Sequence, residues 1–169
     1  MANYSKIKLF DIANGFGIRT SIFFSGCDHH CKNCFNKELW EFDVGERFTE
    51  ETYATKIKPT ITKHIAGLSI LGGEPMHPHN ISATIHLVEW FKEDFPNKNI
   101  WLWSGYTMKE LVADSNKFRE KNFRVLEYID ALVDGKYIEG RRNLNLMFRG
   151  SSNQIVWKKQ NGVWMEWLT

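Results

Sequence analysis

Alternation of strand-like and helix-like segments is the feature that most restricts the fold of this chain. Four short apolar runs end at glycine or polar residues, as strands do, and they occupy residues 20–25, 67–71, 99–103 and 129–134. Helical patterns separate these runs, at residues 49–64, 81–95 and 107–121. Strand, helix and strand at roughly 30-residue intervals indicate a parallel sheet with right-handed crossovers. We therefore predict an α/β fold with a mostly parallel sheet.

Further details of the pattern extend this prediction. Residues 7–12 are expected to add an edge strand, and residues 152–157 a last strand. In the second helix the apolar residues Ile81, Ile85, Val88 and Phe91 recur at helical spacing, and Asn80 is expected to cap the helix. These apolar positions should face the core.

Length and composition exclude several classes of protein. A chain of 169 residues without a linker or repeat suits a single domain spanning residues 1–169. The formal net charge is only +2 and the basic residues are spread along the chain, so nucleic acid is not favoured as a partner. No apolar run approaches the ~20 residues of a membrane-spanning helix, and no signal peptide is expected. We expect a cytoplasmic protein with no membrane partner.

All three cysteines of the chain lie within the stretch SGCDHHCKNCFN, which leaves the first strand. Three buried small side chains would be one explanation, but the polar residues between the thiols argue against it. A zinc site completed by His29 or His30 is a second, although structural zinc sites usually pair two well-separated ligand couples. A third is an iron–sulfur cluster, where three thiolates leave one of four irons free to bind a substrate. An odd number of clustered cysteines also suits a reducing compartment better than a disulfide framework.

A second motif, Gly72-Gly73-Glu74-Pro75, follows the next strand. By itself this motif is weak evidence, because Gly-Gly and Glu-Pro both favour ordinary turns. Glycines also let a ligand approach the backbone closely, so main-chain groups there can hold an amino group. The cysteine loop, GGEP, WSGY and DGK all follow strands, and parallel sheets bind ligands at that edge. The sequence therefore predicts one site at the carboxyl edge of the sheet.

Together, in this order and on successive strands, the two motifs resemble the radical S-adenosylmethionine (SAM) superfamily. The resemblance implies a partial (open) β/α barrel. It also implies that Cys27, Cys31 and Cys34 ligate a [4Fe-4S] cluster whose fourth iron is chelated by SAM. Gly72, Gly73 and Glu74 then match the motif that holds the methionine amino group. The missing fourth ligand would be the cosubstrate.

One position departs from the superfamily pattern. Many members place an aromatic residue just before the third cysteine, where it lies near the adenine, whereas this chain has Asn33 there and Phe35 just after. The resemblance therefore assigns adenine contact to the segment Asn33, Cys34 and Phe35, in part through main-chain groups.

Three more residues are assigned to SAM through their places after strands. Asp134 and Lys136 are expected beside the ribose or the carboxylate, whose charges they suit. Ser104 is expected at the ribose. The alternative is an ordinary turn for Asp134 and Lys136, and a plain cap for Ser104.

The resemblance narrows to the activating proteins of anaerobic ribonucleotide reductases. It rests on blocks in the same order along most of the chain: DIANGFGIRTSIFFSGC, CFNKELW, LGGEPMHPHN, NIWLWSGY, ALVDGKY and FRGSSNQIVW. It implies SAM cleavage that generates a glycyl radical on anaerobic ribonucleoside-triphosphate reductase, with a reduced flavodoxin-like electron donor. A radical SAM enzyme with a small-molecule substrate and a non-catalytic zinc-binding module are the alternatives.

Tryptophans raise two further expectations. Trp101 and Trp103 alternate on a strand, so they should point to one face. Trp157, Trp164 and Trp167 lie toward the C-terminus, and they either dock on their own domain or mark a partner surface.

Overall fold

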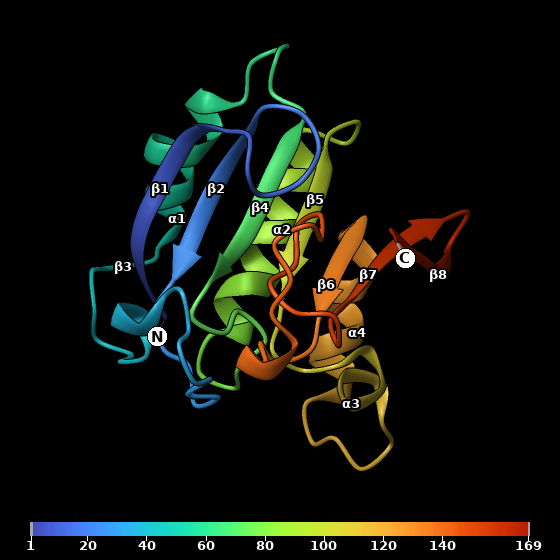
Figure 1. The fold of residues 1–169 in the computed structure, drawn as a ribbon. Helices are drawn as coiled ribbons and strands as arrows, with labels where there is room; N and C mark the ends of the chain where they lie inside the picture. The colour runs from blue at the N-terminus through green and yellow to red at the C-terminus, as the bar shows by residue number, and fades with distance from the viewer. Residues whose placement is uncertain (1, 169) are drawn as a thin grey trace.

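One mixed sheet of eight strands forms the frame of the molecule (Figure 1). The computed structural model describes residues 2–168. Across the sheet the strands follow the order β3-β1-β2-β4-β5-β6-β7-β8. Their bounds are β1 Asn3–Asp11, β2 Arg19–Phe24, β3 Glu46–Arg47, β4 Gly67–Gly72, β5 Asn99–Trp103, β6 Ala131–Asp134, β7 Ile155–Gln160 and β8 Val163–Trp167.

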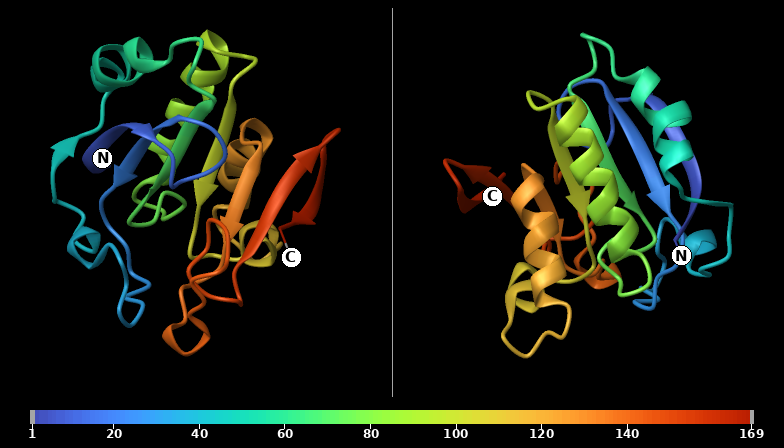
Figure 2. Two further views of the ribbon diagram at one scale, coloured as in Figure 1. Left: turned by 45° about the horizontal axis from the view of Figure 1, so that its top comes forward. Right: turned by 180° about the vertical axis from the view of Figure 1, so that it is seen from behind.

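Helices cover one face of this sheet. The two longest, α2 and α4, pack side by side behind the central strands, while loops cross the opposite face (Figures 1 and 2). The α-helices are α1 Glu50–Thr52, α2 Ile81–Asp94, α3 Met108–Val112 and α4 Arg119–Tyr128. Short 3₁₀ or π segments are η1 Lys37–Leu39, η2 Tyr53–Ile57, η3 Lys58–Thr60 and η4 Glu139–Arg141.

The expected α/β class is observed, but the prediction of a mostly parallel sheet is wrong. Strands β2, β4, β5 and β6 pair in parallel, which gives three parallel pairings. The other four pairings, at the two ends of the sheet, are antiparallel. Antiparallel neighbours need only a short connection, and β7 turns directly into β8 through Asn161 and Gly162, both at positive φ. In the described residues the end strands β3 and β8 do not pair with each other, so the sheet is open.

Two predicted helices differ from the observed ones. The helix expected at 107–121 is two helices, α3 and α4, separated by a turn. Asn116 organises that turn, because its side chain donates to the Glu110 oxygen (2.9 Å) and accepts from the Phe118 amide (2.8 Å). Such local bonds compete with the helical ladder. The helix expected at 49–64 is broken into α1, η2 and η3, and Pro59 lies in the last of these.

The helix α2 follows its predicted pattern, since Ile81, Ile85, Val88 and Phe91 are all buried in the main core. Asn80 occupies the N-cap position of this helix as predicted, but its side chain makes no bond to the helix amides. Asn80 is instead fully buried and donates to the main-chain oxygen of Ser25 (2.8 Å). Its amide group therefore links the start of α2 to the loop that carries the cysteines.

The opposite face of the sheet carries an aromatic cluster. Trp101 and Trp103 point to this face as expected, and their rings stack with centroids 5.7 Å apart. Trp167 and Phe148 pack against Trp101. The C-terminal hairpin thus docks on its own domain through Trp167. In the described residues no helix has the length and apolar character needed to cross a membrane.

Candidate functional site

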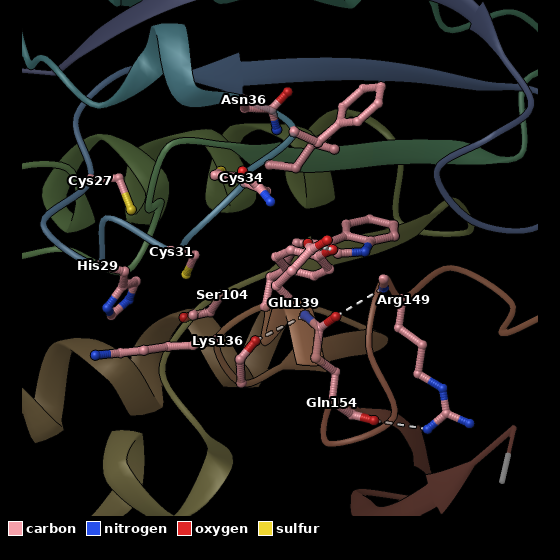
Figure 3. Close-up of a pocket in the computed structure, with 18 of the residues that line it drawn as sticks. Cys27, His29, Cys31, Cys34, Asn36, Ser104, Lys136, Glu139, Arg149 and Gln154 are labelled. Carbon is pink, nitrogen blue, oxygen red and sulfur yellow. Dashed lines mark hydrogen bonds between the residues drawn. The ribbon is translucent and has the colours of Figure 1, made fainter. Parts of the chain in front are cut away.

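A cavity of about 660 Å³ opens at the carboxyl edge of the parallel strands. Pockets for small molecules fall in this size range. Its walls come from the loops after β2, β4, β5 and β6, together with the segment before β7 (Figure 3). The four loops that the sequence places at one edge therefore meet around one space. The cysteine loop and the segment 136–150 extend beyond the same end of the central strands (Figure 2).

All three cysteines line this cavity. Cys27 is buried, with 8% of its surface exposed, and Cys31 and Cys34 are half-buried. The start of the loop is held by main-chain bonds from Gly26 to Leu39 (2.9 Å) and from Cys27 to Trp40 (2.9 Å). Three thiols from one short loop thus face a space large enough for a group bound among them.

The thiols fit a polynuclear cluster better than a single ion. In the part of the chain that the structure describes, no three His, Cys, Asp or Glu side chains surround one point closely enough to hold one metal ion. Thiolates that each bind a different iron of one cluster need not converge in this way. In the described residues His29 and His30 therefore complete no preformed mononuclear zinc site with the cysteines.

Burial makes the free thiols of Cys27 and Cys31 poor anions. Loss of solvent raises the pKa of Cys27 to about 12, and the nearby Glu74 adds to this effect. Burial also raises the pKa of Cys31, as does Cys34, while Lys136 acts in the opposite direction. Thiolates at these positions consequently need a cationic group beside them, which bound iron supplies.

The GGEP turn presses its backbone against the start of the cysteine loop. Gly73 donates to the Phe24 oxygen (2.7 Å), and Glu74 donates to the Gly26 oxygen (2.8 Å). Gly72 has a φ of 114°, and a Cβ at Gly73 would lie 2.5 Å from the Gly26 oxygen. Only glycine permits this approach, and both glycines line the cavity.

The carboxylate of Glu74 does not line the cavity with them. Glu74 is 1% exposed, and its side chain points into the protein between the loops after β2, β4 and β5. It accepts hydrogen bonds from His29 and from the loop after β5. The structure thus brings Gly72 and Gly73 to the cavity, and not the charge of Glu74.

The remaining predicted residues divide in the same way. Ser104 and Lys136 line the cavity, Ser104 at the end of β5 and Lys136 after β6. Ser104 Oγ donates to Glu74 (2.9 Å). Asp134 is 2% exposed and its carboxylate accepts from the Met108 amide (2.5 Å) and the Ile155 amide (3.2 Å). Asp134 therefore lies outside the cavity and joins α3 to β7.

Asn33 and Phe35 lie at the mouth of the cavity, on either side of Cys34. The φ of Asn33 is 56°, in the left-handed region that asparagine tolerates and bulky residues avoid. Phe35 is 97% exposed, so no residue that the structure describes covers its ring.

Sequence reasoning missed other residues of the cavity wall. His29 lines the cavity with its side chain 8% exposed, although the sequence suggested it only as a possible zinc ligand. Gln154 joins two wall segments, because its amide donates to the Gly135 oxygen (2.9 Å) and accepts from the Gly150 amide (2.9 Å), as Figure 3 shows. The polar block GSSNQ was the available signal, but sequence alone could not indicate these partners.

Comparisons with known proteins agree with this site. Residues 13–157 match the family model of the 4Fe-4S single cluster domain. That span contains all three cysteines and every loop around the cavity.

Curated relatives cover nearly the whole chain. The anaerobic ribonucleoside-triphosphate reductase-activating protein of Vibrio cholerae is 43% identical over 157 residues, which are 91% of this chain and 96% of the relative. The proteins of the same name from Escherichia coli K12 and Enterobacteria phage T4 are 38% and 36% identical. These matches span 91% and 96% of this chain, and 97% of each relative. The chain therefore belongs to the family of anaerobic ribonucleoside-triphosphate reductase-activating proteins and contains that family's 4Fe-4S domain.

Proposed function

We propose that this chain is a radical SAM enzyme that generates a glycyl radical on an anaerobic ribonucleoside-triphosphate reductase. One observation carries the proposal: the three thiols and the two glycines of GGEP face the same cavity. A [4Fe-4S] cluster on the thiols would thus lie beside a backbone that a small ligand can approach closely. The names of the relatives support the identity of the target.

In this proposal Cys27, Cys31 and Cys34 would hold the cluster and leave one iron open, to which the amino and carboxylate groups of SAM would bind. When bound, the reduced cluster supplies one electron to the sulfonium of SAM, which yields methionine and a 5′-deoxyadenosyl radical that takes a hydrogen atom from a glycine α-carbon of the reductase. The walls of the cavity orient the reactants and exclude water.

Main-chain and uncharged groups carry most of the proposed SAM contacts. Gly72 and Gly73 offer backbone to the methionine part, and Ser104 lies beside them for the ribose. Lys136 is the charged candidate for the carboxylate, because it is exposed and lies near Cys31. The side chains of Glu74 and Asp134 are not proposed as ligands, since amides, hydroxyl or imidazole groups already occupy their carboxylates.

Adenine is proposed to lie at the mouth of the cavity, along the segment Asn33, Cys34 and Phe35. The exposed ring of Phe35 can stack on a base, and backbone groups of the segment can bind its edge. Asn33 supports this role through its left-handed backbone, which turns the segment.

We further infer that the open sheet is the partial barrel of a single radical SAM domain. The four central parallel strands, with α2 and α4 on one face and the cavity at the carboxyl edge, support this inference. Clustered thiols that serve a reduced cluster also favour a cytoplasmic location. The reduced flavodoxin-like donor is proposed only because the resemblance to the family implies it.

The proposed reaction is tested by following the transferred hydrogen. A reductase deuterated at its glycine α-carbons is mixed anaerobically with SAM and the reconstituted protein, reduced by dithionite. We expect 5′-deoxyadenosine that carries one deuterium. Cleavage of SAM that the reductase neither stimulates nor labels would contradict the proposal and favour a small-molecule substrate. About one zinc per chain and no sulfide would favour the zinc module.

A further inference from the structure

We propose that the side chains of Glu74 and His29 form a positioning pair, which docks the segment between the first two cysteines onto the GGEP turn. The pair acts on the cluster loop and not on SAM directly. This inference deepens the proposed function and rests on it for the identity of the cluster and of SAM. The hydrogen bonds that define the pair belong to the chain itself.

The hydrogen-bond acceptor positions of the Glu74 carboxylate are all in use. A carboxylate offers about four lone-pair positions on its two oxygens. In the structure four donors from three loops use them. They are Met76 N (2.9 Å) and Ser104 Oγ (2.9 Å) at Oε1, and His29 Nε2 (2.9 Å) and Gly105 N (2.6 Å) at Oε2. An ammonium group of a ligand could bind this carboxylate only by displacing one of these donors.

The surroundings of His29 fit its side chain closely. His29 lies between Cys27 and Cys31, and its side chain is only 8% exposed, whereas Asp28 and His30 on either side are exposed. Its ring packs edge-on against Tyr106 with centroids 4.6 Å apart. A Cβ at Gly105 would lie 2.2 Å from this ring, so the glycine leaves room for it. The imidazole thus fits into a slot of the loop after β5.

The start of the cysteine loop, just before Cys27, is held as well, in this case by Asn80, which follows the GGEP turn. Asn80, fully buried, donates to the oxygens of Ser25 (2.8 Å) and Glu74 (3.0 Å). The residues before Cys27 are therefore fixed by Asn80, and those after Cys27 by His29. Two of the cluster ligands then take their positions from hydrogen bonds to the GGEP turn and its neighbour.

His30 supplies a matched control. It also lies between Cys27 and Cys31, but it is exposed, and its ring packs against Trp40 with centroids 4.6 Å apart. A His30→Ala variant removes an imidazole from the same segment and leaves the bond to Glu74 in place. His29→Gln is the conservative variant, because the glutamine amide can donate from nearly the position of Nε2.

The first experiment measures amide hydrogen exchange of residues 27–31 in the full chain without cluster. His29→Ala should speed exchange in this segment by about tenfold or more, since it loses a hydrogen bond to a charged group. His29→Gln should restore slow exchange, and His30→Ala should resemble the parent. Equal exchange in the parent, His29→Ala and His30→Ala would overturn the proposal.

The second experiment uses the reconstituted protein and the Glu74→Gln variant. We expect release of iron to a chelator to accelerate by about tenfold, while the Kd of SAM per intact cluster changes by less than about twofold. A Kd raised about tenfold or more, with iron release unchanged, would identify the carboxylate as a SAM ligand and overturn the pair. The EPR spectrum of the reduced cluster with SAM gives an independent signature of its environment.

The two proposals fail separately. Exchange in the cluster-free chain requires neither SAM nor a reductase, so it tests the pair even if the enzyme has another substrate. A failed hydrogen transfer to the reductase would leave the exchange result standing, and the reverse also holds.

Discussion

Cys31 is the second of the three proposed cluster ligands along the chain, and its half-buried thiol lines the cavity with the other two. Loss of this thiolate leaves two ligands for four irons. Cys31→Ala should therefore lose most of the cluster iron, about four per chain when intact, and all SAM cleavage. Iron and sulfide analysis after anaerobic reconstitution checks this, with the exposed neighbour Lys32→Ala as the control. Normal activity in Cys31→Ala would refute the ligand assignment.

Gly73 meets main chain where a side chain would begin. A Cβ there would lie 2.5 Å from the Gly26 oxygen, a contact that no rotamer can relieve. Gly73→Ala should therefore destabilise the protein by about 1–3 kcal/mol and lower its iron content, because Cys27 follows Gly26. Gly140→Ala is the matched control, since a Cβ there meets nothing within 4 Å. Unfolding curves of the cluster-free chains compare the two, and equal stability would contradict the packing.

The carboxyl group of Asp11 makes the free energy of unfolding depend on pH. Burial alone would raise the pKa of this carboxyl, but hydrogen bonds from Ser21, Asn14 and Lys8 outweigh it and lower the pKa to about 2. Because the folded pKa lies below the ordinary 3.8, the stabilisation is complete above about pH 4 and is lost as the pH falls toward 2.

The Asp11→Asn variant should flatten this part of the profile. The parent is expected to lose up to about 2 kcal/mol of unfolding free energy between pH 5 and pH 2 beyond what the variant loses. Urea unfolding of the cluster-free chains at several pH values measures the difference. Parallel profiles would show that the carboxyl titrates normally.

Among the elements, the segment 136–150 depends on a few side chains for its position. Gln154 joins Gly135 to Gly150, and Arg149 donates to the Gln154 oxygen (2.8 Å). Gln154→Ala removes the first two links and should let the segment open more often. Trypsin cleavage after Arg141 and Arg142, both exposed, should accelerate by about tenfold.

The control for this cleavage is Ser152→Ala, which alters an exposed side chain two residues away. Equal cleavage of the Gln154→Ala protein and the control would mean that other contacts hold the segment. Retained SAM binding in the intact Gln154→Ala protein would place the segment outside the cofactor contacts.

Element types were predicted well where one pattern dominates. The apolar runs at 20–25, 67–71, 99–103 and 129–134 all correspond to strands, and α2 has its predicted buried face. The strand β8 was missed because it lies at the sheet edge, where three of its five residues are exposed and no buried pattern marks it. The break between α3 and α4 depends on the side chain of Asn116, which periodicity does not detect.

For the whole molecule, strand order was the part that sequence could not supply. The sequence places each motif after a strand, and this was enough to predict a common site. The structure confirms that the cysteines, Gly72, Gly73 and Ser104 line one cavity. Side-chain direction was not predictable, since the cited partners of Glu74 and Asp134 lie on other elements of the fold, 45 residues away for Glu74 and 26 and 21 residues away for Asp134. The spacing of the central strands likewise did not indicate the antiparallel strands at both ends of the sheet.

In the proposed function, this fold places a cluster and SAM where a reductase can present a glycine. An EPR spectrum tests it most directly, recorded after the reduced, reconstituted protein is mixed anaerobically with SAM and the anaerobic reductase. We expect a doublet of the glycyl-radical type that is absent with Cys31→Ala. No doublet, with the cluster intact and SAM cleaved, would contradict it.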